Sequence, residues 1–275
     1  MNPYAASSDL PKPSSEKVVV RLRDGVVADA LDHLADEVPV ALVYNGISHA
    51  VMMATPQDLE AFALGFSLTE AIIDSPAECY GIDVEVGESG IAVNLDIATR
   101  AFVALKERRR SLTGRTGCGL CGVDSLDQVY RSLPVLTRTT PLLRSSVIKA
   151  LAALKGEQPL NRLTGATHAA AWCGADGKLV IVREDVGRHN ALDKVIGAMA
   201  RLPAHDPDGF MLISSRVSVE MAQKTAMAGV AALVAVSAPT AAAIRLAEGC
   251  GMTVIAFARG EDFVCYAHPA GLLLD

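Results

Sequence analysis

The sequence predicts an α/β protein in which a small N-terminal α+β unit precedes a larger unit of alternating strands and helices. Three observations support this fold class. The chain of 275 residues is 51% hydrophobic and only 20% charged, which is typical of a protein with a large buried core. Hairpin signals join the apolar runs of the first half. In the second half, strands alternate with helices, which predicts a mostly parallel sheet covered on both faces.

The charge and the aromatic content argue against a nucleic-acid partner. Its 25 Lys and Arg residues face 31 Asp and Glu residues, so the net charge of −6 has the wrong sign for coating nucleic acid. Aromatic residues make up only 4% of the chain, too few for a platform that stacks bases. We therefore predict no nucleic-acid partner, and any anion site must be a local basic cluster.

Two segments bear on cellular location. Residues 1–17 lack the basic start and apolar stretch of a secretory signal, and we predict a disordered tail. The segment Thr225–Ile244 carries no charge, but it is rich in Ala and contains Gly229 and Pro239. It is better explained by a buried helix end, a strand and a helix start than by a membrane span. We expect a soluble, cytoplasmic protein with no membrane partner.

Residues 18–105 predict the small α+β unit. The run VVVRLRDG (18–25) alternates like a strand, and Asn45-Gly46 lies between two apolar runs as in a hairpin. Pro56 marks the first turn of a helix that we place from about Pro56 to Ala71. A second hairpin joins GIDVEV and GIAVNL across residues 87–90.

Residues 106–140 predict a basic, glycine-rich loop and linker. The stretch KERRRSLTGR, residues 106–115, holds five basic residues, and TGCGLCG follows it. So many glycines do not form a stable helix interior, and loops of this kind often carry function.

Residues 141–275 predict the larger unit, beginning with the helix SSVIKALAALKG. A third hairpin joins AAAWC and LVIVR across Asp176-Gly177. A helix from about Asn190 to Ala200 follows, and then the strands FMLISS, ALVAVS and MTVIAF alternate with two helices.

The Cys118-Gly-Leu-Cys121 pair permits three interpretations. A structural zinc site needs two more ligands, and the sequence has no second Cys/His cluster. A thioredoxin-type redox pair normally follows a strand, whereas glycine flanks this pair on both sides. In the third interpretation, one thiol carries a persulfide. Nearby basic residues would stabilise a thiolate there, although they also fit a solvated helix end: Arg108, Arg109, Arg110 and Arg115. The other cysteines are scattered singly and are expected to be reduced and buried: Cys79, Cys173, Cys250 and Cys265.

Polar residues gather where three strands end. They occupy residues 183–190, 214–216 and 257–260, and ligands of open α/β sheets bind at such ends. Arg, Ser, His and Gly at these places suggest a phosphate-bearing ligand. The alternative is that Asp185 or Ser215 merely caps a helix. His168, before another strand, is alone more simply a structural histidine. Walker and GxGxxG sequences are absent, so ATP hydrolysis and dinucleotide redox chemistry have no support.

Several longer motifs resemble one family. The stretches GRTGCGLCGVD, LTGATHAAAWC, REDVGRHNALDKVIG, SSRVSVEMAQKTAMAGV and AFARGEDFVCYAHP are similar to the formate dehydrogenase accessory sulfurtransferase family, over residues 18–269. The resemblance implies a sulfur carrier, hence a sulfurtransferase acting through a cysteine persulfide. It takes sulfur from a cysteine desulfurase and passes it to the molybdenum bis(molybdopterin guanine dinucleotide) cofactor, before the cofactor enters formate dehydrogenase. A homodimer is also expected.

The resemblance also assigns residues. Cys118 would carry the persulfide, and Cys121 would assist or resolve it. Near Asp262, relatives tend to have another basic residue, so backbone N–H groups around Gly260 become the more important contacts. The implied cofactor stretch comprises Phe257, Ala258, Arg259, Gly260, Glu261 and Asp262. A surrounding pocket is predicted from position: His168, Arg188, His189, Ser214 and Arg216.

The implied fold of the second unit is a cytidine-deaminase-like three-layer α/β/α domain. Zinc deaminases need H-x-E at one helix start and P-C-x-x-C at the next, whereas these starts read Arg188-His189-Asn190 and Ser215-Arg216-Val217. Deamination and a bound metal are therefore not predicted. Two other functions stay open: a chaperone that only holds the cofactor, and a CxxC thiol oxidoreductase.

Overall fold

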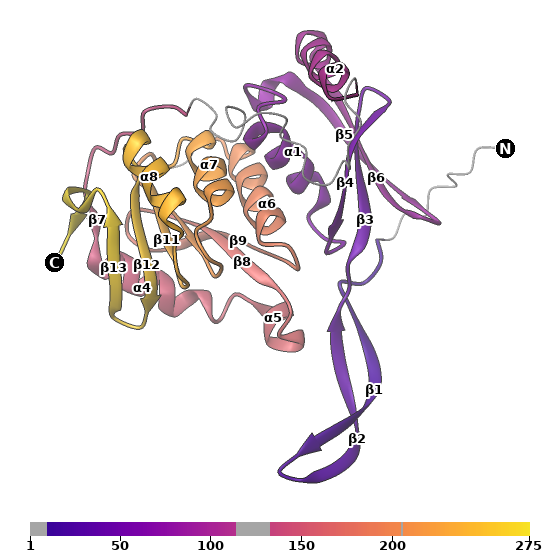
Figure 1. Ribbon diagram of the computed structural model, residues 1–275, viewed down its shortest axis with the longest axis horizontal. Helices are drawn as coiled ribbons and strands as arrows, with labels where there is room; N and C mark the ends of the chain where they lie inside the picture. Colours follow the sequence, from indigo (N-terminus) through magenta and orange to yellow (C-terminus); the bar gives the residue numbers. More distant parts are fainter. Residues whose placement is uncertain (1–9, 114–132, 205) are drawn as a thin grey trace.

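The computed structural model describes residues 10–113, 133–204 and 206–275, which form two units side by side (Figure 1). The first unit contains a four-stranded sheet of order β4-β3-β6-β5 and a separate two-stranded hairpin, β1-β2. The second contains a six-stranded sheet of order β13-β12-β11-β10-β8-β9. In the described residues, no helix is long and apolar enough to cross a membrane.

The four-stranded sheet confirms both hairpins predicted for the first unit. β3 (Val38–Tyr44) and β4 (Ile47–Ala54) turn at Asn45-Gly46, and β5 (Cys79–Gly87) pairs with β6 (Gly90–Ile97). Both residues of the first turn have positive φ, at 46° and 81°, as a two-residue hairpin loop requires. α1 (Leu59–Thr69) packs on one face of this sheet, inside the predicted helix. The 3₁₀ turn η1 (Pro76–Glu78) leads into β5.

The β1-β2 hairpin corrects the boundary of the predicted tail. β1 (Ser14–Arg23) begins inside residues 1–17, and its predicted strand pairs with β2 (Val26–Ala35) along its full length. The turn is Asp24-Gly25, with φ values of 52° and 79°. Ser14 belongs to a strand because it pairs with Ala35, which lies outside the tail. The composition of the tail alone therefore does not predict this pairing.

The second correction concerns the start of the basic segment. α2 (Thr99–Thr113) continues through residues 106–113, where a loop was predicted. Lys, Glu and Arg favour helix, and the glycines begin only at Gly114. Ala101 and Leu105 lie on the buried side of α2, so packing also supports the helix.

The six-stranded sheet has helices on both faces, which confirms the three predicted layers (Figure 1). One face carries α6 (Arg188–Ala200), α7 (Val219–Met227) and α8 (Ala241–Cys250). The other carries α4 (Arg144–Leu154). The short α5 (Pro159–Thr164) precedes the sheet, and the C-terminal segment adds η2 (Pro269–Gly271) and a small β7-β14 pair (Leu142–Leu143 with Leu272–Leu273). The likeness to cytidine deaminases stays a prediction.

The prediction of a mostly parallel sheet is wrong. Within the described six-stranded sheet, only β10 (Phe210–Ile213), β11 (Ala232–Ala235) and β12 (Thr253–Arg259) pair in parallel. The remaining pairings are antiparallel, because β8 (His168–Cys173) and β9 (Leu179–Asp185) form a hairpin and β13 (Asp262–Ala267) folds back on β12. The six-stranded sheet is therefore mixed, because antiparallel strands flank its three parallel strands on both sides.

The two units meet where α1 crosses α6. A Cβ placed on Gly65 would lie 1.8 Å from the carbonyl oxygen of Asp193, and one on Gly197 would lie 1.9 Å from that of Ala61. The helix backbones thus approach more closely than any other residue type would permit. This contact fixes the first unit against the middle and the second half of α6.

Candidate functional site at the carboxyl ends of the central strands

The three parallel strands end at one edge of the sheet and bring two predicted segments together there. The carboxyl ends of β10, β11 and β12 lead into residues 214–216, 236–239 and 257–262. Hydrogen bonds tie these segments: the Val236 N–H donates to the Ile213 carbonyl at 3.0 Å, and the Phe257 N–H donates to the Ser237 carbonyl at 3.2 Å. This edge is where open α/β sheets bind ligands. We call it the strand-end site.

The antiparallel β8 brings His168 to the same edge. The Ala169 N–H donates to Ser214 Oγ at 2.9 Å, and the Ser214 N–H donates to the Ala169 carbonyl at 2.9 Å. His168 pairs across the sheet with Asp185, the last residue of β9, and α6 begins three residues later at Arg188. His168, Ser214 and Arg188, which are distant in sequence, therefore share this edge.

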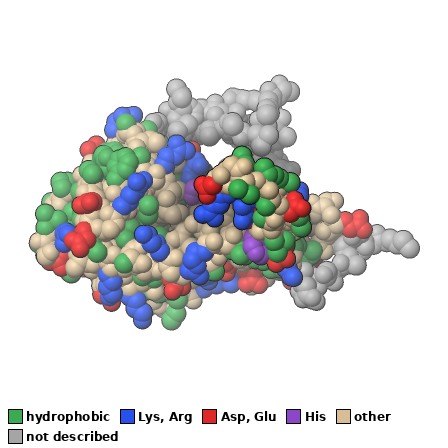
Figure 2. Space-filling model, turned by 90° about the horizontal axis from the view of Figure 1, so that it is seen from below, with side chains coloured by type: hydrophobic (Ala, Val, Ile, Leu, Met, Phe, Trp, Pro, Cys, Tyr) green, Lys and Arg blue, Asp and Glu red, His purple; other side chains and the backbone are tan. Residues whose placement is uncertain are grey.

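Two guanidinium groups make the strand-end site cationic. Burial lowers the pKa of His168, and the positive charges of Arg188 and Arg216 lower it further, against the opposing effect of Asp185. The imidazole is therefore neutral at pH 7. Figure 2 looks onto this side of the molecule and shows Lys and Arg side chains gathered around a hollow. Such a surface attracts anions.

The start of α6 contains two buried nitrogen atoms that lack hydrogen-bond partners among the described residues. They are Arg188 Nε and His189 Nε2. Burial lowers the pKa of His189 to about 4, and the charges of Arg188 and Lys224 add to the effect. Buried polar groups without partners are rare in proteins, so these atoms suit an additional ligand. A phosphate group would satisfy the guanidinium.

The predicted cofactor stretch spans the end of β12, the turn and the first residue of β13, and its residues differ in accessibility. Ala258 is buried in the core, so only its backbone is available to a ligand. Phe257 is 43% exposed, has a positive φ of 52° and contacts the ring of Tyr266. Gly260 turns the chain with a φ of 61°. The other three residues are exposed, and one of them, Glu261, pairs with Arg144 at 3.1 Å: Arg259, Glu261 and Asp262.

Cys118 and Cys121 lie outside the described residues, and so does Arg115. The chain that follows residues 114–132 is attached near the amino ends of the three parallel strands. The Leu136 N–H donates to the Cys250 carbonyl at 2.8 Å, and the Thr139 N–H donates to Asp208 Oδ1 at 2.8 Å. Asp208 lies just before β10, and hydrogen bonds from Thr139 hold its pKa at about 2. This attachment lies at the edge opposite the strand-end site.

Most of the EDVGRHNALDK motif is structural, which the sequence analysis missed. Asp185 pairs with Lys194 at 2.7 Å, and both side chains are fully buried. Asp185 also accepts a hydrogen bond from the Thr55 N–H at 3.0 Å, and Lys194 donates to the Thr55 carbonyl at 3.0 Å. The motif thus joins the second unit to the β4-α1 connection of the first. An Asp and a Lys nine positions apart gave no signal for this pairing.

The neighbouring acids and hydroxyls extend this structural role. Glu184 accepts hydrogen bonds from the Leu160 and Asn161 N–H groups at 2.9 and 2.7 Å, which caps α5. Asp193 pairs with Lys224 at 2.9 Å. The suggested capping role of Ser215 is not observed, because the N-cap of α7 is Ser218. Asp185 does serve the start of α6, since it accepts the Gly187 N–H at 2.8 Å.

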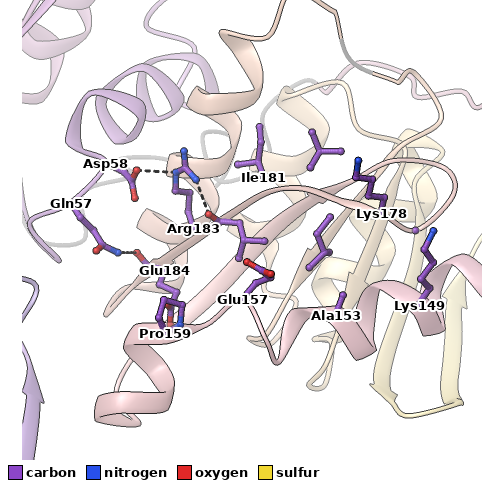
Figure 3. A pocket seen from close by; sticks show the side chains of 14 residues that line it. Gln57, Asp58, Lys149, Ala153, Glu157, Pro159, Lys178, Ile181, Arg183 and Glu184 are labelled. Atoms are coloured by element: carbon purple, nitrogen blue, oxygen red, sulfur yellow. Dashed lines mark hydrogen bonds and ion pairs between the residues drawn. The ribbon is translucent and has the colours of Figure 1, made fainter.

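A separate pocket of about 680 Å³ lies beside β9, between α4 and the first unit (Figure 3). Arg183 pairs there with Asp58 at 3.0 Å, and Gln57 Nε2 donates to the Glu184 carbonyl at 3.4 Å. Of the residues predicted at the strand ends, only Arg183 and Glu184 line this pocket. Its labelled contacts link the two units, so we interpret it as part of their interface.

The four cysteines of the described chain are free. Cys173 and Cys250 are buried as predicted, whereas Cys79 and Cys265 are half-buried. Burial raises the pKa of all four thiols. A raised pKa disfavours the reactive thiolate, so these residues are poor candidates for sulfur chemistry.

Comparisons with known proteins agree with the motif resemblance. A family model described as the FdhD/NarQ family matches residues 35–273. The "Sulfur carrier protein FdhD" of Cupriavidus necator is 53% identical over 273 residues, covering 99% of this chain and 94% of the relative. That of Bordetella petrii is 49% identical over 262 residues, covering 94% of each.

A solved structure shares the fold. It is a formate dehydrogenase accessory protein from Desulfotalea psychrophila, which matches with a TM-score of 0.75 and 22% identity. The match covers 94% of this chain and 99% of that one. Taken together with the sequence relatives, these findings show that the chain belongs to the FdhD/NarQ family.

Proposed function

We propose that this chain is a sulfur carrier that takes persulfide sulfur from a cysteine desulfurase and delivers it to a molybdenum bis(molybdopterin guanine dinucleotide) cofactor destined for formate dehydrogenase. Relatives about half identical over nearly the whole chain are named sulfur carrier proteins. The observation that supports the acceptor is the strand-end site. There, Arg188 and Arg216 lower the pKa of His168, and two buried nitrogen atoms have no hydrogen-bond partner in the part of the chain that the structure describes.

The chemistry of the strand-end site suits the diphosphate groups of this cargo. Guanidinium groups bind phosphate through paired, charge-assisted hydrogen bonds, which Arg188 and Arg216 would supply. Arg259 and the backbone around Gly260 lie on the neighbouring turn and would extend the contact along the phosphates. His168, neutral at pH 7, would act as a hydrogen-bonding group rather than as a third cation.

The sulfur chemistry would use the CxxC pair. The Cys118 thiolate attacks the outer sulfur of the donor's persulfide, so an S–S bond forms on Cys118 while the donor's S–S bond breaks and releases its thiolate. Cys121 then attacks Cys118 Sγ, which forms the Cys118–Cys121 disulfide and releases hydrosulfide to the acceptor. A thiol reductant restores the two thiols. Electrons balance, because the disulfide takes up the oxidation state that the persulfide carried.

The chain length permits delivery to the strand-end site, although the described end of the CxxC segment is attached at the opposite edge of the sheet. Between Thr113 and Leu133 lie 19 residues, numbers 114–132. A chain of this length spans at most ~65 Å when extended. The same length allows the donor and the acceptor to be met on different sides of the molecule.

The carrier half of the proposal is tested by intact-mass analysis after incubation with a cysteine desulfurase and cysteine. We expect the wild type to gain one sulfur atom that a reductant removes, Cys118→Ala to gain none, and Cys121→Ala to retain the added sulfur. If the wild type gains no sulfur while the desulfurase is active, the chain is not a carrier. A cofactor chaperone, which the strand-end site alone could support, would then be the better function.

The acceptor half is tested by binding of guanosine diphosphate, which represents one end of the cofactor. We expect Arg216→Gln to weaken binding about tenfold at low salt and less at high salt, because phosphate contacts are electrostatic. Arg245→Gln is the control, since Arg245 is an exposed residue of α8. Equal affinities for the two variants would show that Arg216 does not contact the ligand.

A third function, a thiol oxidoreductase, has a different readout. A reversible disulfide with turnover against thiols, without need for cofactor, would indicate that function.

A further inference from the structure

A hollow of about 510 Å³ lies where α6 and α7 end. Both helices begin beside the strand-end site, so their ends lie at the opposite edge of the six-stranded sheet. Every described residue that lines the hollow is apolar, and such surfaces mark interaction sites. We call it the apolar hollow, and its lining includes Leu68, Ile196, Met199, Leu202 and Met227.

The elements that form the apolar hollow are firmly joined to one another. Gly65 and Gly197 bring the backbones of α1 and α6 into contact, as described above. The buried ion pair of Asp193 and Lys224, at 2.9 Å, connects α6 to α7. The hollow is therefore already formed in the free protein, and a side chain that enters it does not have to order its walls first.

The apolar hollow lies between the two described ends of the segment that carries the CxxC pair, residues 114–132. On one side, α2 packs through Leu105 into the same core cluster that Leu68 contacts. On the other side, Leu133 and Leu202 both pack against the core of the second unit. Figure 1 shows α2 and the ends of α6 and α7 at the top of the view. A protein that approaches the CxxC segment from this side therefore meets the hollow.

The sulfur-carrier function, on which this inference rests, requires such a protein. The donor holds its sulfur on a cysteine of its own, and that sulfur must come within bonding distance of Cys118. The acceptor belongs to the strand-end site at the opposite edge. The sulfur donor is therefore the partner that the edge with the hollow best accommodates.

The charges beside the apolar hollow are already neutralised within the chain. Arg201 pairs with Glu60 at 3.0 Å, and Arg100 pairs with Asp74 at 2.8 Å, close in sequence to Pro76 of the lining. A charged side chain of a partner would lose its water in the hollow without gaining a counter-charge. An aliphatic or aromatic side chain has no such cost, and anchors of this kind dominate the affinity of protein interfaces.

We propose that the apolar hollow is the docking site of the sulfur donor, which inserts one aliphatic or aromatic side chain into it. Acidic residues surround this anchor on the donor, because the chain that leads to the CxxC pair has five basic residues within 106–115. The anchor supplies affinity, and the opposite charges orient the donor toward Cys118.

Single-turnover sulfur loading of the full chain, measured by intact mass, tests the docking site with two donors. One is a cysteine desulfurase with cysteine, in excess over the chain. The other is glutathione persulfide, whose outer sulfur passes with its hydrogen to the Cys118 thiolate while the glutathione thiolate leaves. This small donor needs no docking surface, so it reports the carrier chemistry alone.

We expect Met227→Glu to raise the desulfurase concentration that gives half-maximal loading at least about tenfold, because a carboxylate in the hollow excludes an apolar anchor. Its loading from glutathione persulfide should equal that of the wild type. Ala204→Trp fills the hollow without adding a charge and should show the same selective loss. Ala204 is exposed, so the fold accommodates the larger side chain.

Val180→Glu is the matched control, because Val180 is a 50% exposed apolar residue of β9 that lies outside the hollow. This variant should load like the wild type from both donors, and circular dichroism checks that all three variants are folded. Normal desulfurase dependence in Met227→Glu and Ala204→Trp would overturn the docking site.

Two further outcomes separate this inference from the sulfur-carrier function. An equal loss of loading from both donors would overturn the docking site, since the hollow would then serve the CxxC segment itself. A wild type that accepts sulfur from glutathione persulfide but not from the desulfurase would overturn donor docking and leave the carrier chemistry in place. A wild type that accepts sulfur from neither donor would instead contradict the sulfur-carrier function, and the docking site with it.

Discussion

Residues 185–194 contain two kinds of buried polar group: some have partners within the protein, and others do not have one among the described residues. Asp185 and Lys194 are fully buried, and they satisfy each other and the backbone of Thr55. Arg188 and His189 lie between them in sequence, yet each keeps a buried nitrogen without a partner among the described residues. A satisfied charge pair holds the two units together, whereas an unsatisfied donor remains available to a ligand. Whether a buried charged group has a partner in the protein, rather than its residue type, therefore distinguishes a structural role from a ligand-binding role here.

The largest expected effect comes from breaking the satisfied pair. Lys194→Met leaves the Asp185 carboxylate buried without a counter-charge, which should lower the free energy of unfolding by ~3–5 kcal/mol. Arg188→Met is the matched control, because it removes a cation from the same helix and should change stability by only ~0.5 kcal/mol. Urea unfolding measures both. Equal losses in the two variants would mean that the distinction between the regions is wrong.

A smaller loss is expected where the two units touch. Gly197→Ala adds a Cβ that would lie 1.9 Å from the Ala61 carbonyl oxygen, so α1 and α6 must separate, at ~3 kcal/mol. Gly249→Ala in α8 is the control, because its Cβ would have no atom within 4 Å. Helix propensity should make that variant more stable by up to ~1 kcal/mol. Thermal unfolding that ranks the two variants in the opposite order would contradict the close helix contact.

The smallest effect concerns pH and the unsatisfied region. The pKa of His189 falls from 6.5 to about 4 on folding, under burial and the charges of Arg188 and Lys224, with Glu220 and Glu70 opposing. Between these values the unfolded chain binds a proton that the folded chain does not, so this contribution to stability rises from pH 4 to pH 6.5. The full shift corresponds to ~3.4 kcal/mol, and we expect ~1–2 kcal/mol because the ring is partly exposed.

His189→Gln should flatten this part of the stability curve, measured by urea unfolding at pH 5 and pH 7. Asp208, whose pKa is held at about 2, acts only at lower pH and serves as an internal reference. An unchanged slope in the His189 variant would show that another group titrates there.

Local signals predicted many elements of this fold. Asn45-Gly46 and Asp176-Gly177 marked their hairpins, and Pro56 marked the approach to α1. The Asp24-Gly25 turn carried an equally strong signal, but the strand after it was not recognised, so the projecting hairpin was missed. The helix α2 was not predicted, and its second half was assigned to a loop because its basic residues were grouped with the glycines that follow them.

The candidate site was predictable in part, because polar residues at strand ends indicate an edge of a sheet. His168, Ser214 and Arg188 do meet at one edge. The structural role of Asp185 and Lys194 was not predictable, since their contacts with Thr55 span about half the chain. Nor could sequence show that the described end of the CxxC segment is attached at the opposite edge, through Asp208.

The sequence alone determined the family, the secondary structure of the core and the residues available for sulfur and phosphate chemistry, because these depend on residue type and local spacing. The tertiary structure decided which charges are neutralised, which glycines touch and which apolar faces stay uncovered. Each of these depends on a partner distant in the chain, such as Thr55 for Asp185 and Asp193 for Gly65. Local spacing contains no information about such a partner, and packing supplies it.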